Sequence, residues 1–185
     1  MYYFLTFISL FLLSCGESKD TKITKSVTES NEIAEEKPAK NPITAEIDLI
    51  ALEKSGIFKD TLTIHIDEDP VFSTKKTYKG VSFNKMLEKY FDIAGLDTSK
   101  TRLIFECTDN YITSMNLGLA LHHKGFIAFK DVDAPTGQRF LSAKKGTEIK
   151  ELAPFYLVWQ DYKKGSKGFS FPYNLLKIKL QHIDE

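Results

Sequence analysis

The residue best suited to chemistry in this sequence is a cysteine that follows a hydrophobic run. Residues 101–106 have the composition of a buried strand, and they lead directly into the polar segment Cys107-Thr-Asp-Asn-Tyr111. Loops at the ends of strands are where binding and catalytic side chains concentrate. A thiolate at Cys107 would ligate a soft metal or act as a nucleophile, whereas a thiol packed among apolar side chains would be inert. The residue types alone leave both interpretations open.

The other candidate ligands do not form a recognisable metal site. His122 and His123 are expected at the end of a short helix, where the helix dipole favours a protonated imidazole, and this interpretation is preferred over metal ligation. Asp131 and Asp133 lack the further oxygen ligands and the glycine of a calcium-binding loop. The chain contains no P-loop, dinucleotide-binding glycine motif, HExxH, GxSxG or CxxC sequence, so several enzyme classes lose their support.

Aromatic residues are concentrated near the C-terminus, where they are expected to form core or to line a pocket. They are Phe155, Tyr156, Trp159, Phe169, Phe171 and Tyr173. If their rings were exposed, they would also suit a stacking platform for a carbohydrate or a base.

The overall charge excludes one class of partner. Lys and Arg total 25, as do Asp and Glu, so the formal net charge is zero. No basic excess is available to neutralise phosphates, and nucleic acid is therefore not expected as a partner.

The first residues have the features of a bacterial lipoprotein signal. Residues 1–14 carry no charged side chain and are mostly apolar, but they are shorter than the roughly 18 residues that a membrane-spanning helix needs. They lead into Leu-Leu-Ser-Cys15-Gly, which resembles a lipobox, although no Lys or Arg precedes the apolar run. We expect residues 1–15 to be a signal peptide with its lipobox cysteine, and Cys15 to be acylated. The alternative is an N-terminal anchor helix with an incidental cysteine.

A polar segment separates this signal from the folded part. Residues 16–44 contain no aromatic side chain and many Lys, Glu, Ser and Thr, so they cannot bury enough apolar surface to fold. We expect a disordered tether there and one folded domain over residues 45–185. The expected location is the cell envelope, where lipid would anchor the chain to a membrane and the domain would face the periplasm or the cell surface.

Periodicity within residues 45–185 predicts an α+β fold with a mixed β-sheet and short helices. Ser82 is a suitable N-cap for a helix over 83–91, which Tyr78-Lys-Gly-Val81 would introduce and Gly95 would end. Residues 131–146 are expected to form a long surface loop, and residues 117–121 a second short helix. Alternating or continuous apolar residues predict strands over 47–51, 62–66, 101–106, 126–129, 153–160 and 175–180.

The order of several motifs resembles a known family. They are Tyr78-Lys-Gly-Val-Ser-Phe83, Phe105-Glu-Cys-Thr-Asp-Asn-Tyr111, Ala153-Pro-Phe-Tyr-Leu-Val-Trp159 and Phe171-Pro-Tyr173. Together they resemble small periplasmic members of the oxidoreductase molybdopterin-binding domain family, which has the sulfite-oxidase-type fold. Small members typically have Asp-Gly-Tyr where this chain has Asp109-Asn110-Tyr111.

The resemblance implies a molybdopterin-dependent oxidoreductase with a periplasmic or cell-surface redox role and a redox partner protein. Cys107 would then give its thiolate to molybdenum, and Asp109, Asn110 and Tyr111 would shape the cofactor pocket. The pterin phosphate would contact three basic side chains, Arg139, Lys144 and Lys145. The alternative is a non-catalytic lipoprotein that keeps the scaffold without the cofactor and binds a ligand or a protein, because fold does not imply function.

Overall fold

The computed structural model describes residues 46–145 and 147–183. The predicted signal peptide, the lipidation site Cys15 and the tether over residues 16–44 lie outside the described residues and stay predictions. No helix within the described ranges is long and apolar enough to span a membrane.

The first of two four-stranded sheets holds the strand that ends at Cys107. Its order is β1 (Glu46–Asp48), β10 (Leu175–His182), β4 (Thr101–Cys107) and β5 (Ile112–Asn116), and all its strand pairs are antiparallel. Along β4, Leu103, Phe105 and Cys107 are buried, while the residues between them are more accessible. This alternation directs one face of β4 into the core.

The second sheet is also antiparallel and is covered by apolar residues on both faces. Its order is β2 (Leu62–Ile66), β3 (Lys76–Ser82), β6 (Gly125–Asp131) and β9 (Tyr156–Trp159). Leu157 and Trp159 belong to the large core cluster that also contains Phe105 and Cys107, whereas Tyr156 and Val158 belong to a second, smaller cluster. Burial on both faces explains why β9 is continuously hydrophobic.

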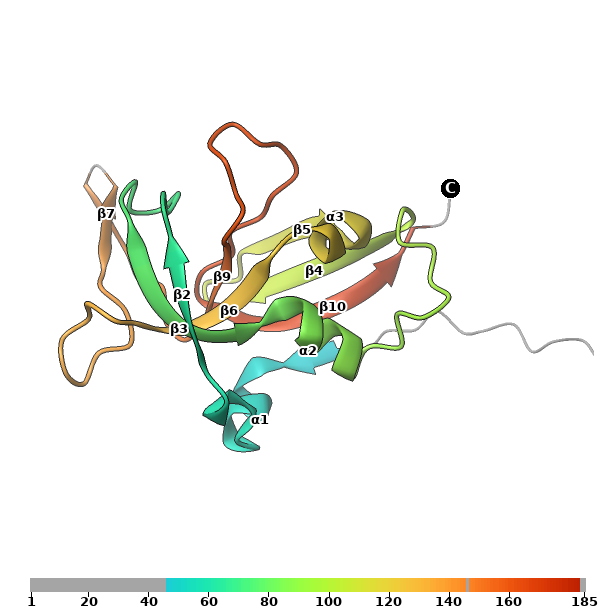
Figure 1. Ribbon diagram of the computed structural model, residues 1–185, viewed down its shortest axis with the longest axis horizontal. Coiled ribbons are helices and arrows are strands. Elements are labelled where there is room, and N and C mark those ends of the chain that lie inside the picture. Colours follow the sequence, from blue (N-terminus) through green and yellow to red (C-terminus); the bar gives the residue numbers. More distant parts are fainter. Residues whose placement is uncertain (1–45, 146, 184–185) are drawn as a thin grey trace, which may run out of the picture. The chain divides into compact units, whose positions relative to one another are not determined.

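A short hairpin lies at one end of the second sheet, beside the connection between β2 and β3 over residues 67–75, which we call the tip of β2–β3 (Figure 1). The hairpin consists of β7 (Ala143–Lys145) and β8 (Glu148–Lys150). The tip is held by Asp69, which is fully buried and accepts hydrogen bonds from the Val71 amide at 2.8 Å and from the Tyr78 hydroxyl at 2.8 Å. Because a buried carboxylate requires such donors, Asp69 ties the tip to the sheet.

Three short helices start at polar side chains that cap them. Asp48 accepts from the Ala51 amide at the start of α1 (Leu49–Lys54), which the 3-10 helix η1 (Ile57–Lys59) follows. Ser82 caps α2 (Phe83–Tyr90), as predicted. Asn116 caps α3 (Leu117–His122) through a 3.0 Å bond from the Leu119 amide. Each cap satisfies an amide that the helix itself leaves without an acceptor.

The predicted α+β class is confirmed, with corrections in particular segments. The predicted strand over 47–51 ends at Asp48, because that residue caps a helix instead of continuing the alternation. Tyr78 to Val81 belong to β3, and the predicted loop over 131–146 contains β7 from residue 143. The described strand pairs are all antiparallel, so the sheets are not mixed as expected. The predicted strands over 62–66, 101–106, 126–129 and 175–180 and the helices over 83–91 and 117–121 are confirmed to within a few residues.

Candidate functional site

The β4–β5 loop is a tight turn that separates a buried thiol from exposed polar groups. The Cys107 amide donates to the Tyr111 carbonyl at 3.0 Å, and the Asn110 amide donates to the Cys107 carbonyl. Asn110 has φ of 61°, a left-handed conformation that asparagine tolerates better than most residues. Asp109 accepts from the Tyr111 amide at 3.2 Å, which fixes the turn from outside.

Cys107 points into the apolar core. It is 6% exposed, shares the buried face of β4 with Phe105, and lies opposite the fully buried Leu175 on β10. Burial, with a smaller effect from the Asp109 charge, raises the pKa of Cys107 to about 11. The side chain is therefore a neutral thiol at neutral pH, as expected for a cysteine without a nearby positive charge.

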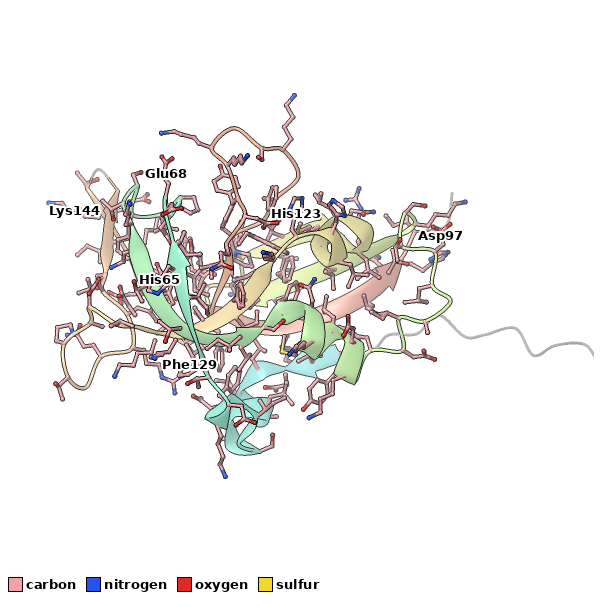
Figure 2. The ribbon with its side chains drawn as sticks, in the orientation of Figure 1. His65, Glu68, Asp97, His123, Phe129 and Lys144 are labelled. Atoms are coloured by element: carbon pink, nitrogen blue, oxygen red, sulfur yellow. The ribbon has the colours of Figure 1, made fainter. Side chains whose placement is uncertain are left out.

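The basic residues that the resemblance assigns to a pterin phosphate have other positions. Arg139 forms an ion pair with Glu53 of α1 at 2.8 Å, and its guanidinium lies 5.8 Å from the centre of the Phe155 ring. Lys144 and Lys145 belong to β7, and Figure 2 shows Lys144 at the outer side of the hairpin. Among the described residues, no hydrogen bond or ion pair joins Arg139 or Lys144 to the β4–β5 loop.

These positions do not fit a molybdenum cofactor. A thiolate ligand and several phosphate-binding cations would have to face one space, but the thiol lies in the core and Arg139 is engaged by a carboxylate. No three His, Cys, Asp or Glu side chains within residues 46–145 and 147–183 are grouped to hold a metal ion. The roles assigned to Cys107, Arg139, Lys144 and Lys145 stay predictions of the resemblance.

A cleft of about 460 Å³ opens beside the same loop, and Cys107 is not among the residues that line it. Aromatic side chains line part of it, namely Tyr111, Phe169, Phe171 and Tyr173. Polar side chains line the rest, namely Asp109, Thr113, Lys150 and Ser170. Of the residues predicted to shape a pocket, Asp109 and Tyr111 are in this lining, whereas Asn110 supplies turn geometry and is not.

The cleft continues towards the tip of β2–β3. A second opening of about 360 Å³ is lined by Pro70, Val71, Glu148, Lys150 and Tyr173, so it shares two residues with the first. Lys150 lies between the two openings, where its ammonium group is 2.8 Å from the Glu148 carboxylate. Glu148 first, and then the Tyr173 hydroxyl, raise the pKa of Lys150 by hydrogen bonding. Its positive charge is therefore paired with a carboxylate.

The aromatic wall of the cleft is held in place by hydrogen bonds from β5 and β9. The Ser170 hydroxyl donates to the Ser114 carbonyl at 2.8 Å and lies 3.2 Å from the Thr113 hydroxyl. The Trp159 indole donates to the Ser170 carbonyl at 2.8 Å. Ser170, the residue before Phe171, is therefore hydrogen-bonded to both β5 and β9, and these bonds fix the position of Phe171.

His123 and Asp161 hold the other end of this wall. His123 Nδ1 lies 3.0 Å from the Asp161 carboxylate, and its ring packs 4.6 Å from that of Phe169. Burial opposes ionisation of Asp161, but the bonds from His123 and from the Lys124 amide outweigh it and lower the pKa of Asp161. The expected helix-end position of His123 is correct, and its contacts are structural.

The sequence identified five of the eight residues that line this cleft. The loop 107–111 was predicted as a site, and Phe169, Phe171 and Tyr173 as core or pocket residues. Thr113 and Lys150 were missed because nothing in their local sequence distinguishes them from other surface residues, and Ser170 was missed as well. The alternation of Phe169, Ser170 and Phe171 was the available signal for a two-faced segment.

Comparison with protein-family models gives no match, and comparison with curated proteins gives none either.

Proposed function

We propose that this chain is a lipid-anchored binding protein whose folded domain holds a small molecule in the cleft beside the β4–β5 loop. One observation carries the proposal: Asp109 and Tyr111 face a cleft, whereas the thiol of the same loop faces the core. Aromatic walls with a few placed polar groups are typical of small-molecule sites. The hydroxyl oxygens of Thr113 and Ser170 can accept hydrogen bonds from such a ligand.

In this proposal the scaffold is of the sulfite-oxidase type but works without the molybdenum cofactor. The order of the motifs from Tyr78 to Tyr173 supports this scaffold. The neutral thiol of Cys107 and the ion pair of Arg139 with Glu53 argue against the cofactor. The domain then needs neither a redox partner nor an electron acceptor.

The proposed anchor is a lipid on Cys15. Acyl chains hold a protein at a membrane much more firmly than a polar tether does, and residues 16–44 would let the domain reach ligands away from the bilayer surface. The cell envelope, on its periplasmic or outer side, is the proposed location.

Hydrogen–deuterium exchange tests the proposed site. Full-length protein in a polyoxyethylene detergent is exposed separately to choline, glucose, dialanine and inorganic phosphate. We expect at least one compound to slow exchange in the segments around Tyr111 and Phe171, and Tyr111→Ala to abolish that protection. Protection confined to other segments, or none with any of the four compounds, would refute the proposed site.

A further inference from the structure

The charges around the cleft indicate what kind of ligand it accepts. Asp109 is exposed, and no described Lys, Arg or His side chain of residues 46–144 and 147–183 forms an ion pair with it. Lys150, the cation in the lining, is paired with Glu148 at 2.8 Å. Asp109 is therefore the carboxylate of the lining that remains open to a ligand, whereas the charge of Lys150 is already paired, so the cleft favours a positive ligand over an anion.

The aromatic groups strengthen this preference. Tyr111 is 55% exposed, and together with Phe171 and Tyr173 it borders the space into which Asp109 opens. The faces of aromatic rings attract cations, and cages of such rings with a carboxylate are a common way to bind alkylammonium groups. A neutral sugar could donate hydrogen bonds to the carboxylate, but unlike an ammonium group it would leave the negative charge without a counter-charge.

We propose that the cleft binds a small organic compound that carries an alkylammonium group. The ammonium group lies against the rings of Tyr111 and Phe171 and is neutralised by the Asp109 carboxylate. The hydroxyl oxygens of Thr113 and Ser170 accept hydrogen bonds from donors on the rest of the ligand. This inference rests on the proposed function and adds the class of ligand to it.

Isothermal titration calorimetry with two compounds of nearly equal shape tests the proposal. Choline carries the quaternary ammonium, and 3,3-dimethylbutan-1-ol is its neutral carbon analogue. Full-length protein in a polyoxyethylene detergent is used, because that headgroup carries neither charge nor sugar. Choline should bind about tenfold more tightly than the alcohol, and its affinity should fall as NaCl is raised. Equal affinities would refute the proposal.

Variants of the two charged residues in the lining test whether the ligand is positively or negatively charged. Asp109→Asn should weaken choline binding by about fivefold or more, whereas Lys150→Met should leave it equal or tighter, because the variant removes a positive charge from the lining. An anionic ligand site would show the opposite pair of changes, and a neutral site would show neither. Asp60→Asn, at an exposed carboxylate outside the cleft, is the matched control and should change nothing.

The ring contribution is tested in the same way. Tyr111→Leu should weaken choline binding several-fold, while Tyr90→Leu, at an exposed tyrosine on α2, should not. Thermal melts of each variant establish that it is folded. Glycerophosphocholine, the soluble headgroup of phosphatidylcholine, is added in place of choline to distinguish a lipid headgroup from a free compound. A headgroup site would bind it and not free choline, which would contradict the proposal.

The outcomes separate this inference from the proposed function. If the neutral alcohol or glucose protects the cleft and choline does not, the cleft is a binding site for another class of ligand. If no compound protects it, both proposals fail.

Discussion

Replacing Cys107 by serine separates a packing thiol from a metal ligand. The side chain is 6% exposed and is surrounded by core residues such as Phe105 and Leu175, both fully buried. Placing a hydroxyl there without a partner costs about 1 to 3 kcal/mol of unfolding free energy. For a domain of this size that lowers the melting temperature by about 3 to 10 °C. Cys107→Ala, which buries no polar atom, is the comparison variant.

The assay combines thermal unfolding with thiol alkylation. The pKa of Cys107 is raised from 9.0 to about 11, so ionisation alone slows alkylation about a hundredfold at neutral pH compared with an ordinary cysteine. The rate should rise steeply up to about pH 11 and should be the same whether or not the host makes molybdopterin. An unchanged melting temperature in Cys107→Ser, or a thiol that reacts quickly at pH 7, would refute the packing interpretation.

Three further predictions concern other parts of the chain. Cys15→Ala should abolish metabolic lipid labelling and release the protein from membranes, and retained label would contradict the lipobox interpretation. Limited proteolysis should cut first within residues 16–44, as read by mass spectrometry, and first cuts within residues 78–121 would show that the expected domain boundary is wrong. Lys76→Ala should lower the unfolding free energy by about 3 to 5 kcal/mol in chemical denaturation, because it leaves the fully buried Asp131, 2.6 Å from the Lys76 ammonium, without its counter-charge, whereas Lys75→Ala at an exposed pair should change little.

Local pattern predicted the elements whose burial follows a simple period. Ser82 before an amphipathic helix, and the alternating apolar residues of β4 and β10, were sufficient for correct assignments. β3 was missed because Lys76 is a buried residue of that strand, and its burial depends on Asp131, which lies at the end of a different strand. No local rule shows that such a lysine will be paired.

The sequence predicted only the part of the candidate site that a single short segment forms. The turn from Cys107 to Tyr111 follows from its own sequence, with Asn110 at the left-handed position. The direction in which the loop's side chains point depends on the pairing of β4 with β10 and β5, and the opposite wall depends on where Lys150 and Ser170 lie after folding. The thiol of Cys107, the residue best suited to chemistry in the sequence, faces the core, whereas the carboxylate of Asp109, two residues later, faces the cleft.

Molybdenum analysis of the full-length protein tests the central proposal most directly, namely that this domain works without the molybdenum cofactor of the family that its sequence resembles. The protein is purified from a host that synthesises molybdopterin, and metal content is measured for the wild type and for Cys107→Ser. We predict molybdenum far below one atom per chain and no difference between the two proteins. Stoichiometric molybdenum in the wild type that is lost in Cys107→Ser would contradict the claim and assign Cys107 to the metal.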